Sequence, residues 1–336
     1  MTNITSREIR LKQRPVGMPT PDDFDLTTVT LAEPGAGEVL VQNLYMSVDP
    51  YMRGRMADRK SYVPPFALGE ALQGGAVGQV VRSNHPNFQS GDYVLSMLGW
   101  REYFVSDGRG LRVITPGGAP LQAFLGVAGM PGQTAYFGLL DIGQPKAGET
   151  VFVSAAAGAV GSVVCQIAKL KGCRVVGSAG AADKVAWLRD EIGIDAAFNY
   201  KENADLKATV AEHCPNGIDI YFENVGGAHL EAALAVMNNH GRIPVCGMIS
   251  LYNATTATAA PTNLGNIIGK RLKLQGFIVT DYQARAGEFY AEMLPWIAAG
   301  KIKWQETIVE GIDQAPAAFM GLFTGDNLGK MLVKLA

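Results

Sequence analysis

The stretch Val151–Ser162, VFVSAAAGAVGS, decides the fold of the central part of this chain. A β-branched and aromatic run leads through small residues into Val163–Leu170, where apolar residues recur at helical spacing. Ala156, Gly158 and Gly161 form the pattern A-x-G-x-x-G between the expected strand and the expected helix. Small residues here let the backbone approach a pyrophosphate, which the N–H groups and dipole of a helix start stabilise. The stretch therefore predicts a dinucleotide-binding turn, with a tight packing turn as the alternative.

The 18 residues of Val151–Ala168 carry no charge, a property that a membrane helix would share. We reject a membrane-spanning helix, because the small-residue turn divides this segment into a buried strand and an amphipathic helix. No membrane partner is expected.

Composition limits the class of protein. A length of 336 residues gives a prior of about two domains. The net charge is −2, from 29 basic and 31 acidic residues, and 48% of residues are hydrophobic, which excludes disorder and disfavours nucleic acid as a partner. The four cysteines form no CxxC pair, and the start MTNITSREIRLKQRP lacks the apolar core of a signal peptide. We therefore expect a reducing, cytoplasmic setting.

The sequence pattern changes twice along the chain. Residues 1–126 hold short β-rich segments between Pro/Gly turns, which predicts a small antiparallel barrel or sandwich. Residues 127–299 alternate strands with helical patterns, which is typical of βαβ units on a parallel sheet. Residues 300–336 return to strand-like sequence around one short helix, and we expect them to rejoin the first domain. The fold class is thus α/β, with a doubly wound parallel sheet and a separate, mostly β domain.

Six strands are expected in the central region. They cover residues 151–155, 173–180, 197–200, 218–226, 241–248 and 272–279. The second of them bears on the cofactor, because an NAD site needs an acidic residue at its end to accept from the ribose 2′-OH. Here the sequence is VVGSAGAADK, with no acid before Asp183 and with Lys184 on the following helix. This favours NADP, with Lys184 on the 2′-phosphate; a solvated helix lysine is the alternative.

Ligands of open parallel sheets lie outside the carboxyl ends of the strands. The candidates at those ends are Tyr200, Asn224, the run Cys246–Tyr252 and the run Phe277–Val279. The amide of Asn224 could hold a ribose hydroxyl or a nicotinamide carboxamide, or it could simply form the turn before Val225.

Neither a metal site nor a nucleophile is expected. The four histidines and four cysteines show no zinc-ligand spacing, although His213 and Cys214 are adjacent, and no G-x-S-x-G motif occurs. The basic run MRGRMADRK at 52–60 is most simply a solvated loop, and a steering patch for a phosphate-bearing cofactor is the alternative.

Several further motifs carry a family resemblance along essentially the whole chain. They are SVDPYMRGRM at 47–56, GMPGQTAYFGLLDIG at 129–143, AAAGAVGS at 155–162, AKLKGCRVVGSAG at 168–180, ENVGG at 223–227, CGMISLYN at 246–253 and GDNLGK at 325–330. With them the chain resembles the zinc-free medium-chain dehydrogenase/reductases, in the branch of prostaglandin reductases, plant alkenal double-bond reductases and bacterial curcumin reductases. CGMISLYN and SVDPYMR are much more specific than the glycine turn.

The resemblance implies a GroES-like catalytic domain at 1–126, a Rossmann NADP-binding domain at 127–299 and a C-terminal segment at 300–336 that returns to the catalytic domain. It implies NADPH-dependent reduction of the carbon–carbon double bond of α,β-unsaturated ketones and aldehydes, with a small-molecule substrate and no metal.

The resemblance also assigns site residues. Those implied to contact NADPH are Gly158, Ala159, Val160, Gly161, Lys184, Tyr200, Asn224, Cys246, Gly247, Met248, Ile249, Ser250, Leu251, Tyr252, Phe277, Ile278, Val279 and Asn327. Tyr252 is implied to be catalytic beside the substrate carbonyl, with Tyr51 and Tyr62 on the other side of the substrate. A protonated tyrosine suits this role, because it can donate to an oxygen that gains charge when hydride reaches the β-carbon. The alternative for Tyr252 is a wall residue.

Two rival functions remain at this point: a zinc-free NADPH:quinone reductase and a non-catalytic NADPH-binding protein. The segment Asn253–Asn263, NATTATAAPTN, departs from the family, whose members often carry a proline-rich loop there. This leaves the size and identity of the substrate open. The apolar sixth strand predicts a homodimer through edge pairing.

Overall fold

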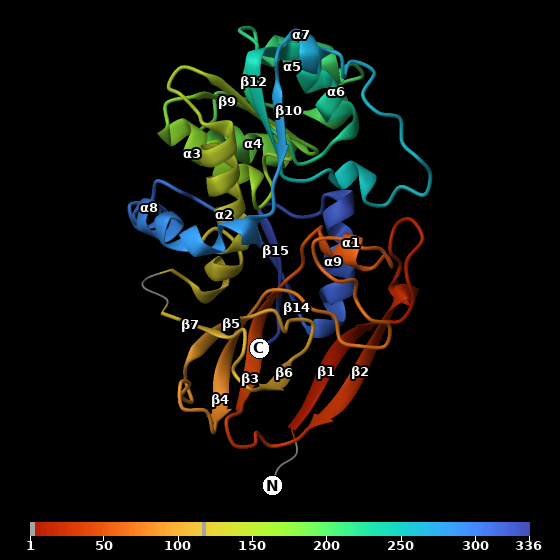
Figure 1. The fold of residues 1–336 in the computed structure, drawn as a ribbon, viewed down its shortest axis with the longest axis vertical. Helices are drawn as coiled ribbons and strands as arrows, with labels where there is room; N and C mark the ends of the chain where they lie inside the picture. The colour runs from red at the N-terminus through yellow and green to blue at the C-terminus, as the bar shows by residue number, and fades with distance from the viewer. Residues whose placement is uncertain (1–3, 116–118) are drawn as a thin grey trace. The chain divides into compact units, whose positions relative to one another are not determined.

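The computed structural model describes residues 4–115 and 119–336 (Figure 1). Contacts divide the chain into two compact units. Unit 1 contains Met1–Leu125, Glu306–Asn327 and Met331–Ala336, and unit 2 contains Gly126–Gln305 and Leu328–Lys330. The last part of the sequence therefore contributes to both units.

Unit 1 is built mainly from antiparallel strands. These are β1 (Ile4–Leu11), β2 (Phe24–Leu31), β3 (Val39–Ser47), β4 (Ala76–Ser83), β5 (Tyr93–Ser96), β6 (Tyr103–Ser106), β7 (Arg112–Ile114), β14 (Glu306–Glu310) and β15 (Lys330–Lys334). Its α-helices are α1 (Met52–Arg55) and α9 (Ala315–Thr324). β1 pairs with β2, and the larger sheet has the order β14-β15-β3-β4-β5-β7, with β6 paired to β3. The mostly β character expected for this part of the sequence is confirmed.

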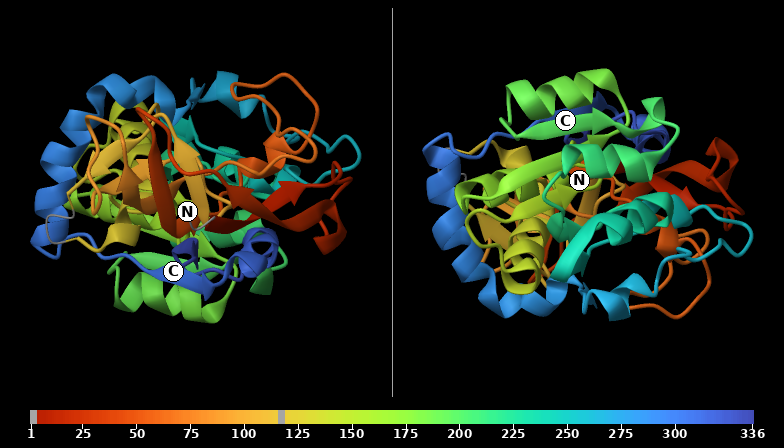
Figure 2. Two further views of the ribbon diagram at one scale, coloured as in Figure 1. Left: turned by 90° about the horizontal axis from the view of Figure 1, so that it is seen from below. Right: turned by 90° about the horizontal axis from the view of Figure 1, so that it is seen from above.

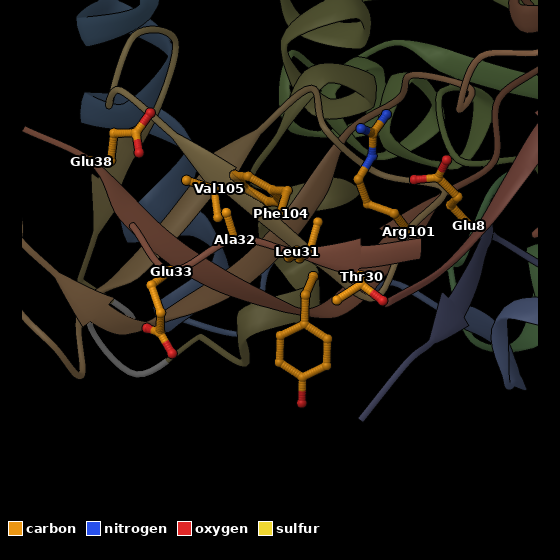
Figure 3. A pocket seen from close by; sticks show the side chains of 10 residues that line it. Glu8, Thr30, Leu31, Ala32, Glu33, Glu38, Arg101, Phe104 and Val105 are labelled. Carbon is orange, nitrogen blue, oxygen red and sulfur yellow. The ribbon is translucent and has the colours of Figure 1, made fainter. Parts of the chain in front are cut away.

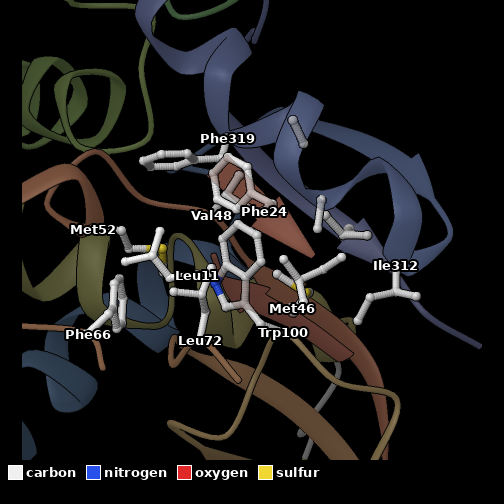
Figure 4. Packing of buried hydrophobic residues seen from close by; sticks show 14 of the residues in the cluster. Leu11, Phe24, Met46, Val48, Met52, Phe66, Leu72, Trp100, Ile312 and Phe319 are labelled. Atoms are coloured by element: carbon white, nitrogen blue, oxygen red, sulfur yellow. The ribbon is translucent and has the colours of Figure 1, made fainter. Parts of the chain in front are cut away.

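The main core of unit 1 gathers around Trp100 (Figure 4). The indole is fully buried, with its ring edge-on to Phe319 at 6.2 Å and stacked on Phe24 at 6.3 Å between centroids. Met52 of α1 lies in the same cluster and is fully buried, which stabilises the fold by about 1.5–3 kcal/mol. Tyr51, the residue before α1, packs against this cluster. The core thereby fixes the short helix and the tyrosine that precedes it.

Unit 2 alternates strands with helices. The strands are β8 (Thr150–Val153), β9 (Arg174–Ala179), β10 (Ala196–Asn199), β11 (Ile218–Phe222), β12 (Met237–Val245) and β13 (Lys273–Gly276). The α-helices are α2 (Met130–Phe137), α3 (Gly161–Leu170), α4 (Ala182–Asp190), α5 (Leu206–His213), α6 (Gly227–Val236), α7 (Asn266–Gly269) and α8 (Ala286–Ala298).

The six strands of unit 2 form one parallel sheet in the order β10-β9-β8-β11-β12-β13. The order reverses between β8 and β11, which makes this the switch point of a doubly wound sheet. Helices lie along both faces of the sheet (Figure 2), and α5 and α6 contribute to a core with Phe152 and Tyr221. The expected fold class is confirmed. Among the described residues, no helix has the length and apolar composition needed to cross a bilayer.

Three expected strands extend three or four residues past the ends that the structure gives them. The fifth was expected over 241–248, whereas β12 covers Met237–Val245. The fourth was expected over 218–226, but β11 ends at Phe222 because the Glu223 carboxylate accepts from the N–H groups of Val225 and Gly226, which folds the chain into a turn. The sixth was expected over 272–279, but β13 ends at Gly276. After it, the Phe277 ring packs edge-on against Phe222 at 6.4 Å, so aromatic packing replaces the strand ladder.

The expectation of a solvated loop at 52–60 is wrong for two of its arginines. Arg53 and Arg55 are both 7% exposed and lie on α1. The guanidinium of Arg53 donates to the carbonyls of Pro15 and Gly17, and that of Arg55 donates to the carbonyl of Pro64. Backbone carbonyls supplied by distant segments satisfy these charges, and composition alone does not reveal such partners.

Candidate functional site at the strand ends of unit 2

The glycine turn between β8 and α3 has steric reasons for its small residues. Ala155 has a left-handed backbone with φ 49°, and its carbonyl points at the turn that follows. A Cβ on Gly161 would lie 2.4 Å from this carbonyl oxygen, and one on Gly158 would lie 3.2 Å from it. A side chain at Gly161 would therefore push the helix start away from the strand.

The start of α3 carries no side-chain cap: Val160 at the N-cap makes no side-chain hydrogen bond. An uncapped helix start next to a glycine turn is a suitable place for a phosphate, which can accept from the N–H groups of Ala159, Val160 and Gly161. Gly329 also lies at this turn, because its N–H donates to the carbonyl of Ala157 over 2.8 Å. Asn327 is two residues before Gly329 in the sequence.

The predicted Tyr200 follows β10 and lies next to Gly180, which follows the neighbouring strand β9. A Cβ on Gly180 would lie 3.0 Å from the Tyr200 hydroxyl and 3.1 Å from Cε of Lys201. The Tyr200 ring also packs edge-on against His229, at 4.8 Å between centroids. Lys184 lies half-buried in the first turn of α4. Lys201 was not predicted, although its place directly after Tyr200 and the third strand could have indicated it.

Asn224 follows β11, and its contacts reach the end of β8. Its side-chain amide donates to the carbonyl of Ser154 over 2.8 Å, and its backbone N–H donates to the Ser154 hydroxyl over 3.0 Å. Its own carbonyl accepts from Ile249 over 3.2 Å. Asn224 therefore holds the ends of two neighbouring strands together at the switch point. Its contact with a cofactor stays a prediction.

Glu223 lies beneath this arrangement and was missed by the sequence analysis. Its side chain is fully buried, and one oxygen, Oε1, accepts from Val225 N, Gly226 N and the Tyr221 hydroxyl at 2.6–2.8 Å. The Ser154 hydroxyl adds a longer contact of 3.3 Å. Burial raises the pKa of Glu223, and the hydrogen bonds partly oppose this effect. A single acidic letter in ENVGG does not indicate burial, which is why sequence reasoning did not find it.

The run Cys246–Tyr252 is hydrogen-bonded to the backbone of the same glutamate. The N–H groups of Cys246 and Gly247 donate to the Glu223 carbonyl over 2.9 and 3.2 Å. The run then turns through η5 (Ile249–Leu251), and the Tyr252 hydroxyl accepts from the N–H of Met248 over 3.3 Å. Burial, with the Glu223 carboxylate adding to it, raises the pKa of the Cys246 thiol to about 12. Cys246 is therefore a poor nucleophile.

The other predicted site residues of unit 2 are mainly packed. Phe277 packs edge-on against both Phe222 and Tyr282, and a Cβ on Gly138 would lie 2.5 Å from Cζ of Phe277. Ile278 and Val279 are half-buried, and Ser250 is exposed.

Tyr51 and Tyr62 form a separate group in unit 1. Tyr51 is half-buried, whereas Tyr62 is 61% exposed. Burial and the Asp49 carboxylate raise the pKa of Tyr51, and the Tyr62 phenol adds to this shift.

Metal-ligand candidates do not gather in the described part of the chain: no group of three His, Cys, Asp or Glu side chains there could hold a metal ion. Nδ1 of His213 forms a hydrogen bond of 2.9 Å with the carbonyl oxygen of Thr209. Burial raises the pKa of the adjacent Cys214 thiol to about 12 and lowers the pKa of His229 to about 4.

A cavity of about 340 Å³ lies elsewhere, in unit 1, between β1, β2 and β6 (Figure 3). Its charged groups have partners within the protein. Glu8 pairs with Arg10 at 2.6 Å, Glu33 pairs with Arg82, and Arg101 donates to backbone carbonyls. The cavity contains none of the predicted site residues.

Known proteins resemble the chain along nearly its whole length. A family model described as the N-terminal domain of oxidoreductase matches residues 7–114, and one described as zinc-binding dehydrogenase matches residues 159–299. The chain is 47% identical to the NADPH-dependent curcumin reductase of Escherichia coli, over 97% of this chain and 96% of that protein. It is 45% identical to a 2-alkenal reductase (NADP(+)-dependent) of Nicotiana tabacum, over 99% and 98%.

A solved structure agrees with these relatives. The crystal structure of CurA in complex with NADPH from Vibrio vulnificus has a TM-score of 0.94 and 48% sequence identity, and the match covers 98% of this chain and 99% of that one. On the strength of these matches, the chain belongs to the zinc-free medium-chain dehydrogenase/reductases.

Proposed function

We propose that this protein reduces the carbon–carbon double bond of α,β-unsaturated ketones and aldehydes, using NADPH as the hydride donor. The observation that carries the proposal is the strand-end site at the β8–β11 switch point, in a chain 45–47% identical to a curcumin reductase and an alkenal reductase. The relatives supply the reaction class, and the site supplies a place for the cofactor.

The strand-end residues would hold NADPH in the order of the sheet. Gly158–Gly161 and the start of α3 would bind the pyrophosphate. Lys184, Tyr200 and the unpredicted Lys201 would surround the 2′-phosphate, since they lie at or follow the ends of β9 and β10. The remaining contacts would come from Asn224, Cys246–Tyr252, Phe277–Val279 and Asn327.

The chain's own chemistry would centre on Tyr252. Bound NADPH supplies the hydride, which the β-carbon of the enone receives. Negative charge then develops on the substrate carbonyl oxygen, and a phenol placed there stabilises it by donating a hydrogen bond or its proton. Water would supply the proton that the α-carbon gains. The Tyr252 oxygen accepts from Met248 N, and a phenol can accept and donate at the same time. Tyr51 and Tyr62 would supply the substrate wall from unit 1.

The domain roles follow from the same proposal. Residues 1–126 would form the substrate domain, residues 127–299 the NADP-binding domain, and residues 300–336 would return to the substrate domain. β13 is an edge strand of the sheet in unit 2 and pairs there with β12, so its other edge could add a strand from a second copy. We propose a homodimer on this basis. A cytoplasmic location is a separate proposal, which rests on the absence of a CxxC pair among the four cysteines.

The test of the function is a comparison of NADPH and NADH oxidation against a short enal, an enone, a bulky dienone and a quinone. Turnover of enals and enones with NADPH supports the proposal. Turnover of the quinone alone would establish a quinone reductase instead. NADPH binding without turnover of any of the four substrates would contradict the enone reductase.

A further inference from the structure

The segment Met56–Phe66 of unit 1 is a loop whose two ends lie together. The N–H of Met56 donates to the carbonyl of Arg53 over 3.2 Å, and the N–H of Phe66 donates to the carbonyl of Arg55 over 2.7 Å. No helix or strand occurs between these residues. The loop therefore leaves the end of α1 and returns to it, as Ω-loops do.

The side chain of Arg55 holds the returning arm of this loop. Its Nε donates to the carbonyl of Pro64 and its Nη2 donates to Oε1 of Gln73, both over 2.9 Å. Its guanidinium also lies 4.0 Å from the centre of the Phe66 ring. A planar guanidinium can donate along two directions and stack on a ring simultaneously, which a lysine ammonium cannot do.

The loop that Arg55 fastens at Pro64 carries Tyr62, one of the two tyrosines proposed for the substrate wall. Burial is the main influence and lowers the pKa of Arg55, while the phenols of Tyr51 and Tyr62 act in the opposite direction. Tyr51 is fixed by the core next to α1, whereas Tyr62 lies in the loop and is 61% exposed. The position of Tyr62 therefore depends on the groups that fasten the loop.

We infer that Arg55 is a positioning residue that fastens the Met56–Phe66 loop and thereby holds Tyr62 in place as a preformed platform for bulky, aromatic enones. The inference rests on the proposed function, from which the substrate class is taken. A fixed aromatic face binds an apolar substituent without paying for loop ordering. A short enal carries no bulky apolar substituent that such a face could bind, so the effect should depend on substrate size.

Arg53 provides a matched control on the same helix. It has the same 7% exposure as Arg55, yet its guanidinium donates to the carbonyls of Pro15 and Gly17, in a different loop. Removing either side chain creates a similar defect in α1, but it is Arg55 that donates to the returning arm of the loop, at Pro64. The departing arm is held by Arg14, which donates to the carbonyl of Met56 over 3.1 Å and is present in both variants.

The first measurement needs no substrate. Arg59 and Lys60 are exposed in the loop, so trypsin cuts there when the loop opens. Arg55→Gln should increase the rate of this cut by about tenfold or more, as expected when charge-assisted hydrogen bonds are lost, and Arg53→Gln should not. Equal rates in the two variants would overturn the fastening role. If Arg55→Gln does not fold, Gln73→Ala removes only the partner of Nη2 and should give a smaller increase.

The second measurement tests the platform. In Arg55→Gln, KM for a bulky aromatic dienone should rise about tenfold, while kcat/KM for a short enal and the Kd for NADPH stay within about twofold. Arg53→Gln and the exposed Arg59→Gln should leave the ratio of the two substrates unchanged. An active Arg55→Gln enzyme with the wild-type ratio overturns the inference alone. A wild type that binds NADPH but reduces no enone overturns the proposed function, and the proteolysis result is unaffected.

Discussion

At the scale of single residues, Glu223 shows how a buried charge can organise a site without facing it. Its carboxylate accepts hydrogen bonds from N–H groups in the turn after β11, and its backbone carbonyl accepts hydrogen bonds from N–H groups in the segment after β12. Both segments carry residues that we propose to contact the cofactor. The cost of this arrangement is a carboxylate in a fully buried place, with Oε2 unpartnered among the described residues.

That cost should appear as a pH dependence of stability. Because the pKa of Glu223 is raised in the folded protein, its contribution is complete below the unfolded pKa of about 4.3 and is lost as pH rises through the folded pKa. Glu223→Gln keeps an acceptor oxygen and has no charge. Its free energy of unfolding should therefore improve relative to the wild type as the pH rises above about 4, by about 1.4 kcal/mol for each unit of pKa shift.

Glu149→Gln is the control with the opposite sign. Burial acts to raise the pKa of Glu149, but hydrogen bonds from Arg242 and from the N–H of Lys146 outweigh it, and the pKa is lowered. Its contribution is present above the unfolded pKa and is lost on acidification. Denaturant unfolding at several pH values gives both trends. A pH-independent difference for Glu223→Gln would contradict the first prediction.

Lys184 should decide the choice between NADPH and NADH. Lys184→Ala should weaken NADPH binding about tenfold to a hundredfold and leave NADH binding nearly unchanged, because a charge-assisted bond to the 2′-phosphate is worth about 1.5–3 kcal/mol. Fluorescence titration with each cofactor provides the measurement, and the exposed Lys207→Ala on α5 is the control. Retained preference for NADPH in Lys184→Ala would assign the phosphate contact to another residue, with Lys201 the next to replace.

Tyr252 should act through its hydroxyl. Tyr252→Phe removes the donor but keeps the ring, so kcat for an enone should fall about a hundredfold or more while the Kd for NADPH changes little. Steady-state kinetics beside Tyr93→Phe in unit 1 separates this effect from the general loss of a phenol. A rate close to that of the wild type would make Tyr252 a wall residue.

At the scale of elements, the sequence predicts where each strand lies better than where it ends. The alternation of apolar runs and helical patterns located all six strands of the parallel sheet. The end of β11 depends on a local turn around the buried Glu223 carboxylate, which a single acidic letter does not reveal, and the end of β13 depends on the packing of Phe277 against the distant Phe222. The buried arginines of α1 were missed because backbone carbonyls outside the helix, at Pro15 and Pro64, supply their acceptors.

The edge strand β13 gives the prediction at this scale. Edge pairing between two copies would place Gln275 near the symmetry-related strand, and like charges along paired strands are destabilising. Gln275→Lys, two residues after Lys273 on the same face of the strand, should shift the molar mass measured by light scattering from dimer toward monomer at micromolar concentration. A wild type that is already a monomer at that concentration would contradict edge pairing.

At the scale of the whole molecule, the four cysteines share one property although they lie in different elements. Cys165, Cys173 and Cys214 are buried, and Cys246 is half-buried. Burial raises the pKa of all four thiols, to about 11 for Cys173 and about 12 for Cys214 and Cys246. Since the thiolate is the reactive form, none of them should react readily at neutral pH.

This property can be measured on the native protein. Intact-mass analysis after exposure to iodoacetamide at neutral pH should show little or no addition, whereas the guanidinium-unfolded chain should take up four groups, one for each cysteine. Ser90→Cys, which introduces an exposed thiol, should add one group rapidly in the folded state. Fast modification of the native wild type would show that the thiols are accessible.

The burial of the thiols should protect the protein from alkylation by α,β-unsaturated carbonyl compounds. The β-carbon that accepts a hydride from NADPH is also the atom that a cysteine thiolate attacks in a Michael addition. A catalyst with an accessible thiolate would be alkylated by the α,β-unsaturated compounds that it reduces. Because its thiols are shielded from solvent, this protein should not be inactivated by alkylation during repeated turnover. Its working lifetime would then be limited by slower processes such as unfolding.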